Sequence, residues 1–110
     1  MSTLNLDTFN EMKELMEDTL DELLDTYLEN TPELIANLKL HLEQGNAEEC
    51  FKCAHQIKGS SSSLGVDEVA LIAKTIEEIG RAGSLDGISE KITELESKYT
   101  LALVEIEKNR

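Results

Sequence analysis

A histidine, a lysine and a glycine near the middle of the chain have a spacing that suits the transfer of an anionic group. Lys58 and Gly59 follow His55 by three and four residues, so a helix would place all three on one face. Imidazole is a nucleophile and an acid or base near neutral pH, and a lysine ammonium can neutralise an anion beside it. Phosphoryl transfer fits best, because its catalysis is mainly positioning and charge neutralisation.

Gly59 supports this interpretation because glycine is costly inside a helix. Relative to Ala, the penalty is about 1 kcal/mol. Gly59 lies one helical turn after His55. We therefore expect the missing side chain to clear space beside the imidazole, giving access to it.

A helix over residues 47–63 would point His55 into solvent. At 100° per residue, its apolar and small residues gather on a core face almost directly opposite His55. This core face comprises Cys50, Cys53, Ala54, Ile57, Ser61 and Leu64. Six residues share the face of His55, namely Glu48, Phe51, Lys52, Lys58, Gly59 and Ser62. Four of these, Phe51, Lys58, Gly59 and Ser62, are expected to contact a partner.

Phe51 has two interpretations, because a large apolar side chain is unusual on a solvent face. It resembles a small interface anchor, since such anchors combine an apolar ring with polar neighbours. Alternatively, a neighbouring helix folds over Phe51 through Leu24 or Tyr27. The sequence leaves both open.

Residues 54–65 carry a family resemblance. They read A-H-Q-I-K-G-S-S-S-S-L-G. This segment resembles the signature of the histidine-containing phosphotransfer (HPt) domain, roughly A-H-x-[LI]-K-G-S-[AS]-x-x-[LIMF]-G. The similarity continues upstream over residues 24–34 and downstream in Ile76-Glu77 and Arg81-Ala82-Gly83, and it covers about residues 15–106.

The resemblance implies a helical bundle that acts as a phosphorelay intermediate without kinase activity of its own. His55 would accept the phosphoryl group, Lys58 would contact it, and Gly59 would give access. The small residues Ser60 and Ser61 would allow close helix packing. The implied partners are the receiver domain of a response regulator and a hybrid sensor histidine kinase, with no cofactor and no metal.

Other functions fit the sequence less well. A non-phosphorylated adaptor that binds a receiver or kinase would not need the intact set of His55, Lys58 and Gly59. A histidine kinase dimerisation domain would need an ATP-binding domain, for which the chain is too short. A metal site at Cys50, Cys53 and His55 is disfavoured because the cysteines and the histidine fall on opposite helix faces. The Gly59–Gly65 segment lacks the preceding strand and the Lys-Ser/Thr ending of a P-loop.

Charge excludes two classes of partner. The chain has 110 residues and a formal net charge of −13, so neither nucleic acids nor anionic membrane surfaces should bind it. Its N-terminus has neither the basic start nor the apolar run of a signal peptide. Two cysteines do not make a disulfide scaffold. We expect a cytoplasmic monomer.

Helical spacing of the apolar residues along the chain predicts an all-α fold. Asp7 can cap a first helix, and an apolar run continues over residues 20–28. Thr31-Pro32-Glu33 either starts a new helix or kinks a long one, which Gly45-Asn46 ends. Further helices are expected over 47–63, from a cap at Asp67 towards residue 79, and over 88–106. We predict a single domain, residues 1–110, forming an up-and-down four-helix bundle with its core at about 32–108 and additional short N-terminal helices.

Overall fold

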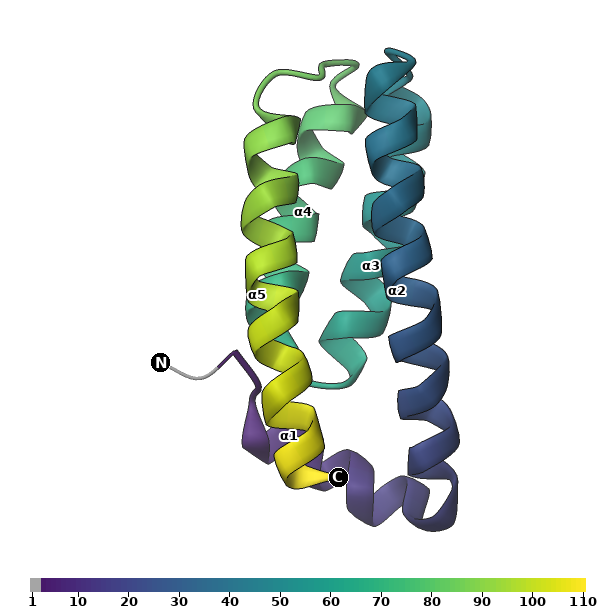
Figure 1. Ribbon diagram of the computed structural model, residues 1–110, viewed down its shortest axis with the longest axis vertical. Coiled ribbons are helices and arrows are strands. Elements are labelled where there is room, and N and C mark those ends of the chain that lie inside the picture. Colours follow the sequence, from purple (N-terminus) through teal and green to yellow (C-terminus); the bar gives the residue numbers. More distant parts are fainter. Residues whose placement is uncertain (1–2) are drawn as a thin grey trace.

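Antiparallel helices form the body of the computed structural model, which describes residues 3–110 (Figure 1). The elements are α1 (Leu6–Met16), a 3₁₀ helix η1 (Glu17–Thr19), α2 (Leu20–Glu43), α3 (Ala47–Ser63), α4 (Asp67–Arg81) and α5 (Ile88–Asn109). Helices α2 to α5 run up and down in chain order, and α1 lies across one end. The predicted all-α bundle is confirmed. No helix over residues 3–110 is long and apolar enough to cross a membrane.

Helix α2 is continuous through Pro32. Of the two alternatives at Thr31-Pro32-Glu33, the structure has one long helix, so the bundle begins at Leu20 and not near residue 32. Proline removes one helical hydrogen bond, and Pro32 lies on the exposed side of α2. The opposite side carries a buried stripe that is apolar except for Thr31 and includes Leu24 and Leu38 on either side of the proline, and its burial stabilises one continuous helix.

Two helix caps differ from the prediction. Asn5, not Asp7, caps α1, and its side chain accepts a hydrogen bond from the Thr8 backbone N–H at 3.2 Å. Val66 precedes α4, so Asp67 is its first helical residue. The Asp67 carboxylate instead accepts a hydrogen bond from Asn5 Nδ2 at 3.0 Å, which draws it away from the capping position.

The predicted core face of α3 is confirmed, since all six of its residues are buried. Ser61 is fully buried and its hydroxyl shares a 2.8 Å hydrogen bond with the Tyr27 hydroxyl of α2. Burial raises the pKa of Tyr27 to about 12, so its hydroxyl keeps its proton. Burial also raises the pKa of the free thiols Cys50 and Cys53, which therefore act as small apolar fillers.

Helices α3 and α4 approach each other closely at Gly80. A β-carbon there would lie 2.9 Å from the Ala47 carbonyl oxygen and 3.0 Å from the Phe51 backbone nitrogen. Only glycine fits this contact without a shift of the backbone. The close packing brings the last two turns of α4 against the first half of α3, where the candidate site lies.

Candidate functional site

His55 lies in the middle of α3 with 61% of its side chain exposed. This confirms the prediction from the helical spacing that His55 faces solvent while its neighbour Ala54 is buried. A side chain held on a rigid helix and open to solvent can be reached by a second protein. Its chemistry then depends on what contacts its two ring nitrogens.

A buried carboxylate on α4 contacts the imidazole. Glu77 has only 2% of its side chain exposed, and its Oε2 lies 2.5 Å from His55 Nδ1. Its other oxygen, Oε1, accepts a 2.7 Å hydrogen bond from Lys58 Nζ. Arg81, one turn further along α4, places its Nη2 3.6 Å from Oε2. Three potential cations therefore surround one carboxylate.

These contacts keep Glu77 ionised. Burial alone would raise the pKa of Glu77, but the hydrogen bonds from Lys58 and His55, together with the charges on both groups, outweigh it and lower the pKa below its ordinary value. An ionised carboxylate can only accept hydrogen bonds. Nδ1 of His55 must therefore be the protonated ring nitrogen, which leaves the lone pair of a neutral imidazole on Nε2.

Phe51 is half-buried beside the histidine. Its ring stacks on the imidazole, with centroids 6.2 Å apart and planes inclined by 29°. The guanidinium carbon of Arg81 lies 5.2 Å from the centre of the Phe51 ring, in a cation–π contact. Arg81 of α4 therefore covers part of the Phe51 ring.

Gly59 and Ser62 are both exposed on the same helix face. A β-carbon at Gly59 would meet no heavy atom within 4 Å. A methyl group at this position would therefore not touch His55, and the space beside Gly59 is open to solvent. The structure brings Phe51 and Lys58 close to His55, directly or through Glu77.

The sequence analysis assigned no role to Glu77 or Gly80, although the structure makes both essential to the geometry. The signal was present in the spacing of the α4 helix. Its buried face comprises Val69, Ala70, Ile72, Ala73, Ile76, Glu77 and Gly80. An acid four residues after Ala73 falls within this apolar stripe, where a carboxylate needs a partner.

The alternative metal site is not formed. Cys50 and Cys53 are buried on the core side of α3, whereas His55 faces outward. Within residues 3–110, no group of three or more His, Cys, Asp or Glu side chains could hold a metal ion. His41 is partly exposed near the end of α2 and belongs to no such group.

Comparison with known proteins identifies relatives of the whole bundle. The family model described as "Hpt domain" matches residues 22–104. Histidine-containing phosphotransfer protein 4 of Arabidopsis thaliana is 30% identical over 98 residues, which cover 84% of this chain and 77% of that protein. Histidine-containing phosphotransfer protein 2 of the same plant is 27% identical over 100 residues, covering 84% of this chain and 64% of that protein.

Two solved structures share the architecture. Histidine-containing phosphotransfer protein B (HptB) from Pseudomonas aeruginosa PAO1 superposes with a TM-score of 0.86 and 32% identity, covering 94% of this chain and 89% of that one. Ypd1 of Saccharomyces cerevisiae, crystallised with the receiver domain of its downstream response regulator Ssk1, gives a TM-score of 0.87 at 19% identity, covering 97% of this chain and 93% of that chain. At 19% identity, Ypd1 speaks to the fold alone. The matched family model and the 30% identical relative show that this chain belongs to the Hpt domain family.

Proposed function

We propose that this chain is a phosphorelay intermediate in which His55 accepts a phosphoryl group from an aspartyl phosphate and passes it on. The observation that carries the proposal is the hydrogen bond from His55 Nδ1 to the buried Glu77 carboxylate. It selects the ring form with a free lone pair on Nε2. Membership of the Hpt domain family supports the same chemistry.

The transfer of the phosphoryl group to His55 needs no additional general base, because no proton has to leave the imidazole. The Nε2 lone pair of His55 attacks phosphorus, an N–P bond forms, and the P–O bond to the donor aspartate breaks. The bonding pair leaves on the aspartate as a carboxylate. The proton stays on Nδ1, so the ring becomes a cation, and Glu77 at 2.5 Å stabilises that positive charge. The same contact serves the reverse step.

Lys58 is proposed to neutralise the bound phosphoryl group. Its ammonium has three N–H donors, of which Glu77 Oε1 engages one at 2.7 Å. The side chain is 31% exposed, so donors remain available on the solvent side. Lys58→Ala should shorten the lifetime of the phosphohistidine or slow transfer. Lys52→Ala, which removes an exposed lysine of the same helix that pairs with Glu49, is the matched control.

The proposed partner is the receiver domain of a response regulator, which would dock over Phe51, Lys58, Gly59 and Ser62. Ypd1 was crystallised with such a domain. The open space at Gly59 would admit the partner's acidic site close to His55. We also propose that a hybrid sensor histidine kinase supplies the phosphoryl group and that residues 1–110 act as one cytoplasmic, monomeric domain without kinase activity.

A labelling experiment tests the proposal. Wild-type protein, His55→Gln and His41→Gln are each incubated with a receiver domain carrying radiolabelled aspartyl phosphate, and acid-labile, base-stable label is measured. We expect wild type and His41→Gln to gain label, and His55→Gln to gain none while keeping its helical circular dichroism. Label on His55→Gln would refute the assignment. Binding of a receiver without label on wild type would favour the adaptor alternative.

A second arm tests the absence of kinase activity. Wild-type protein is incubated with γ-labelled ATP and Mg²⁺ alone. We expect no label on His55 under these conditions, because the helices α1 to α5 occupy almost all of residues 3–110 and leave no room for an ATP-binding domain within them. Label that appears without any partner and is lost in His55→Gln would overturn this part of the proposal.

A further inference from the structure

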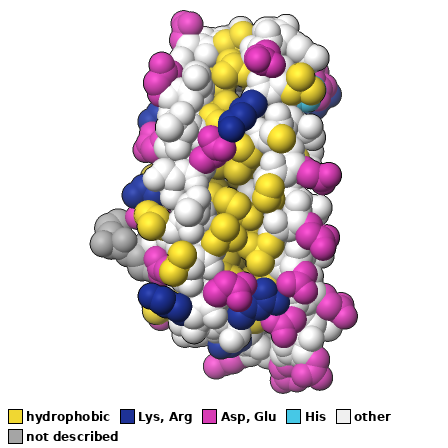
Figure 2. Space-filling model, in the orientation of Figure 1, with side chains coloured by type: hydrophobic (Ala, Val, Ile, Leu, Met, Phe, Trp, Pro, Cys, Tyr) yellow, Lys and Arg dark blue, Asp and Glu magenta, His cyan; other side chains and the backbone are white. Residues whose placement is uncertain are grey.

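An apolar groove runs between α2 and α5, on the side of the bundle that faces the viewer in Figure 2. Hydrophobic side chains show along the middle of this face, with charged side chains on either side. Two hollows lie along the groove, of about 390 Å³ and 230 Å³. The salt bridge from Lys39 Nζ to Glu96 Oε2, 2.8 Å long, separates them, and both residues line both hollows.

The lower hollow has apolar walls from both helices. Pro32, Ile35 and Ala36 of α2 line it, and Pro32 and Ala36 are exposed. From α5, Tyr99 also lines it; only 7% of this residue is exposed, and its hydroxyl has no hydrogen-bond partner within the described part of the chain.

The groove lies on the opposite side of the bundle from His55. Packed neighbours follow the order α2, α3, α4 and α5, and α5 returns to α2 to close the bundle. The His55 site lies on α3 and α4, so the α2–α5 groove is formed by the other two helices. A protein bound in the groove would leave the imidazole open to a second protein.

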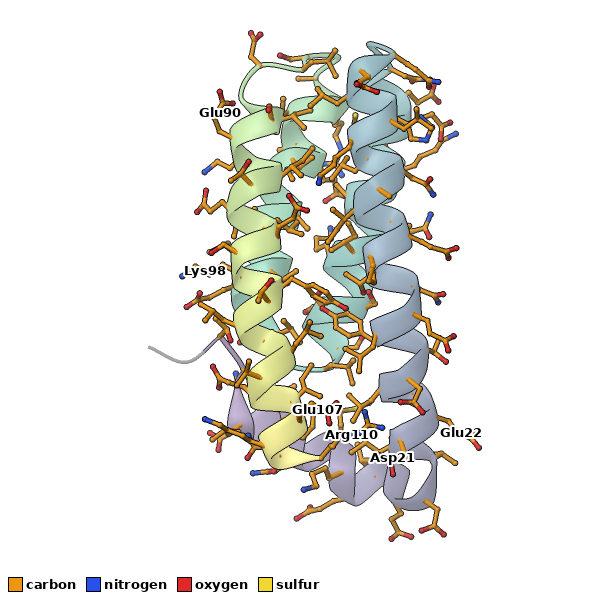
Figure 3. The ribbon with its side chains drawn as sticks, in the orientation of Figure 1. Asp21, Glu22, Glu90, Lys98, Glu107 and Arg110 are labelled. Carbon is orange, nitrogen blue, oxygen red and sulfur yellow. The ribbon has the colours of Figure 1, made fainter. Side chains whose placement is uncertain are left out.

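Charge on the α2 side of the groove is strongly acidic, since residues 20–43 hold six acids and one lysine. Two bases on this face are already engaged: Lys39 pairs with Glu96, and Arg110 pairs with Asp21 at 3.0 Å, with Asp25 and with Glu107 (Figure 3). Glu43 lines the upper hollow and is exposed, and Glu29 is exposed about one turn before Pro32 of the lower hollow. Residues 1–50, which include all of α2, hold 13 acids and only two bases.

This pattern selects one kind of occupant. We propose that the α2–α5 groove binds a basic amphipathic helix of a partner protein, with its apolar face against Pro32, Ala36 and Tyr99 and its lysines or arginines against the acidic side chains of α2. Helix-in-groove recognition uses such an apolar stripe and complementary charge. A second copy of this chain fits poorly, because two grooves that each carry the acidic side of α2, on chains of charge −13, repel each other.

The test uses a synthetic peptide of about four helical turns, with Leu on one face and Lys on the other, and a scrambled peptide of identical composition. Each is titrated into ¹⁵N-labelled wild-type protein. We expect the amphipathic peptide to bind more tightly than the scrambled one, and its amide shift changes to follow the groove-facing turns of α2 and α5. Shift changes centred on α3 or α4, or equal binding of both peptides, would overturn the proposal.

Two neighbouring substitutions on α2 separate groove binding from general attraction between charges. Ala36→Lys and Asn37→Lys each add one positive charge at an exposed position, but Ala36 lines the α2–α5 groove and Asn37 lines the hollow between α2 and α3. Ala36→Lys should weaken binding of the amphipathic peptide about tenfold, and Asn37→Lys less than about twofold. Equal effects, or a larger effect of Asn37→Lys, would overturn the proposal.

Two further measurements complete the design. Sedimentation of the chain without peptide should show no self-association, and dimers lost in Ala36→Lys would assign the groove to a second copy instead. The His55 labelling assay, repeated with the groove saturated by peptide, should give unchanged label. The binding data do not depend on phosphorylation, so this proposal and the proposed function can fail separately.

Discussion

Glu77 is the buried partner of an exposed His55: 2% of the glutamate side chain is accessible, against 61% of the histidine side chain, and the two meet at 2.5 Å. The carboxylate is thus fixed by its surroundings, while the imidazole remains open to another protein. Glu77 is held beside the imidazole by its burial, and His55 is already exposed to a partner. Most of the expected behaviour of the site depends on this pair.

Replacing the carboxylate should change the ring form of the histidine. Glu77→Gln keeps the shape but loses the charge and one acceptor oxygen, so we expect a mixture of Nδ1–H and Nε2–H imidazole in place of Nδ1–H alone. Transfer to His55 should slow by about 10-fold to 100-fold, the range for loss of the partner of a metal-bound histidine. Imidazole ¹⁵N shifts report the ring form. Glu78→Gln, an exposed acid on the same helix, should change neither.

Stability should depend on pH through the same glutamate. Its pKa is lowered in the folded state, so ionised Glu77 stabilises the fold above the ordinary value of 4.5, and this contribution disappears as pH falls through the folded value. The difference in free energy of unfolding between wild type and Glu77→Gln should therefore be largest near pH 7 and shrink below pH 4.5. Urea denaturation at stepped pH measures it. A difference that grows towards acid pH would contradict the prediction.

Gly80→Ala should destabilise the fold. The new β-carbon would meet the Ala47 carbonyl oxygen at 2.9 Å, and backbone atoms cannot rotate away as a flexible side chain can. Alanine favours a helix by about 1 kcal/mol, but overpacking costs about 1–3 kcal/mol, so we expect a net loss. Separation of α3 and α4 should also move Glu77 away from His55 and slow transfer. A urea melt and the labelling assay check both results.

Gly59→Ala should have the opposite effect on stability. Nothing lies within 4 Å of the added carbon, so alanine should stabilise α3 by up to about 1 kcal/mol. Transfer from a receiver should nevertheless slow, because the methyl group occupies space that we assign to the partner. An unchanged transfer rate would show that Gly59 is not part of the docking surface.

Phe51→Ala should weaken receiver binding more than it destabilises the protein. The ring is half-buried between His55 and Arg81 and can contribute to an interface, so a loss of about 1–2 kcal/mol in binding is expected. A binding titration and a denaturant melt of the same variant measure both. Unchanged affinity with a large loss of stability would assign Phe51 to the fold alone.

Local periodicity accounts for what the sequence analysis predicted correctly. The buried face of α3 and the outward direction of His55 follow from 3.6 residues per turn within one helix. The end of α2 at Glu43 likewise lies close to the predicted Gly45-Asn46 stop, since Gly45 has a φ of 69° that favours glycine. These features need no knowledge of neighbouring helices.

Contacts between helices account for what was missed. The pairing of His55 with Glu77 joins residues 22 apart in sequence, and it depends on the rotation of α4 against α3. The closeness of that packing depends in turn on Gly80. Pro32 was ambiguous for the related reason that its local pattern suits a helix start, whereas the burial of Leu24 and Leu38 on the other side of α2 decides for one helix.

The His55 site is built within one helical hairpin. Its chemistry-bearing residues all fall in the continuous stretch from Ala47 to Arg81. Helices α2 and α5 contact this stretch at other residues, for example through the Tyr27–Ser61 hydrogen bond. The site is therefore modular: this one segment, moved into another four-helix scaffold of similar spacing, would take the reactive histidine and its carboxylate with it. Substitutions in α2 and α5 can then change which proteins bind this chain while the chemistry at His55 stays the same.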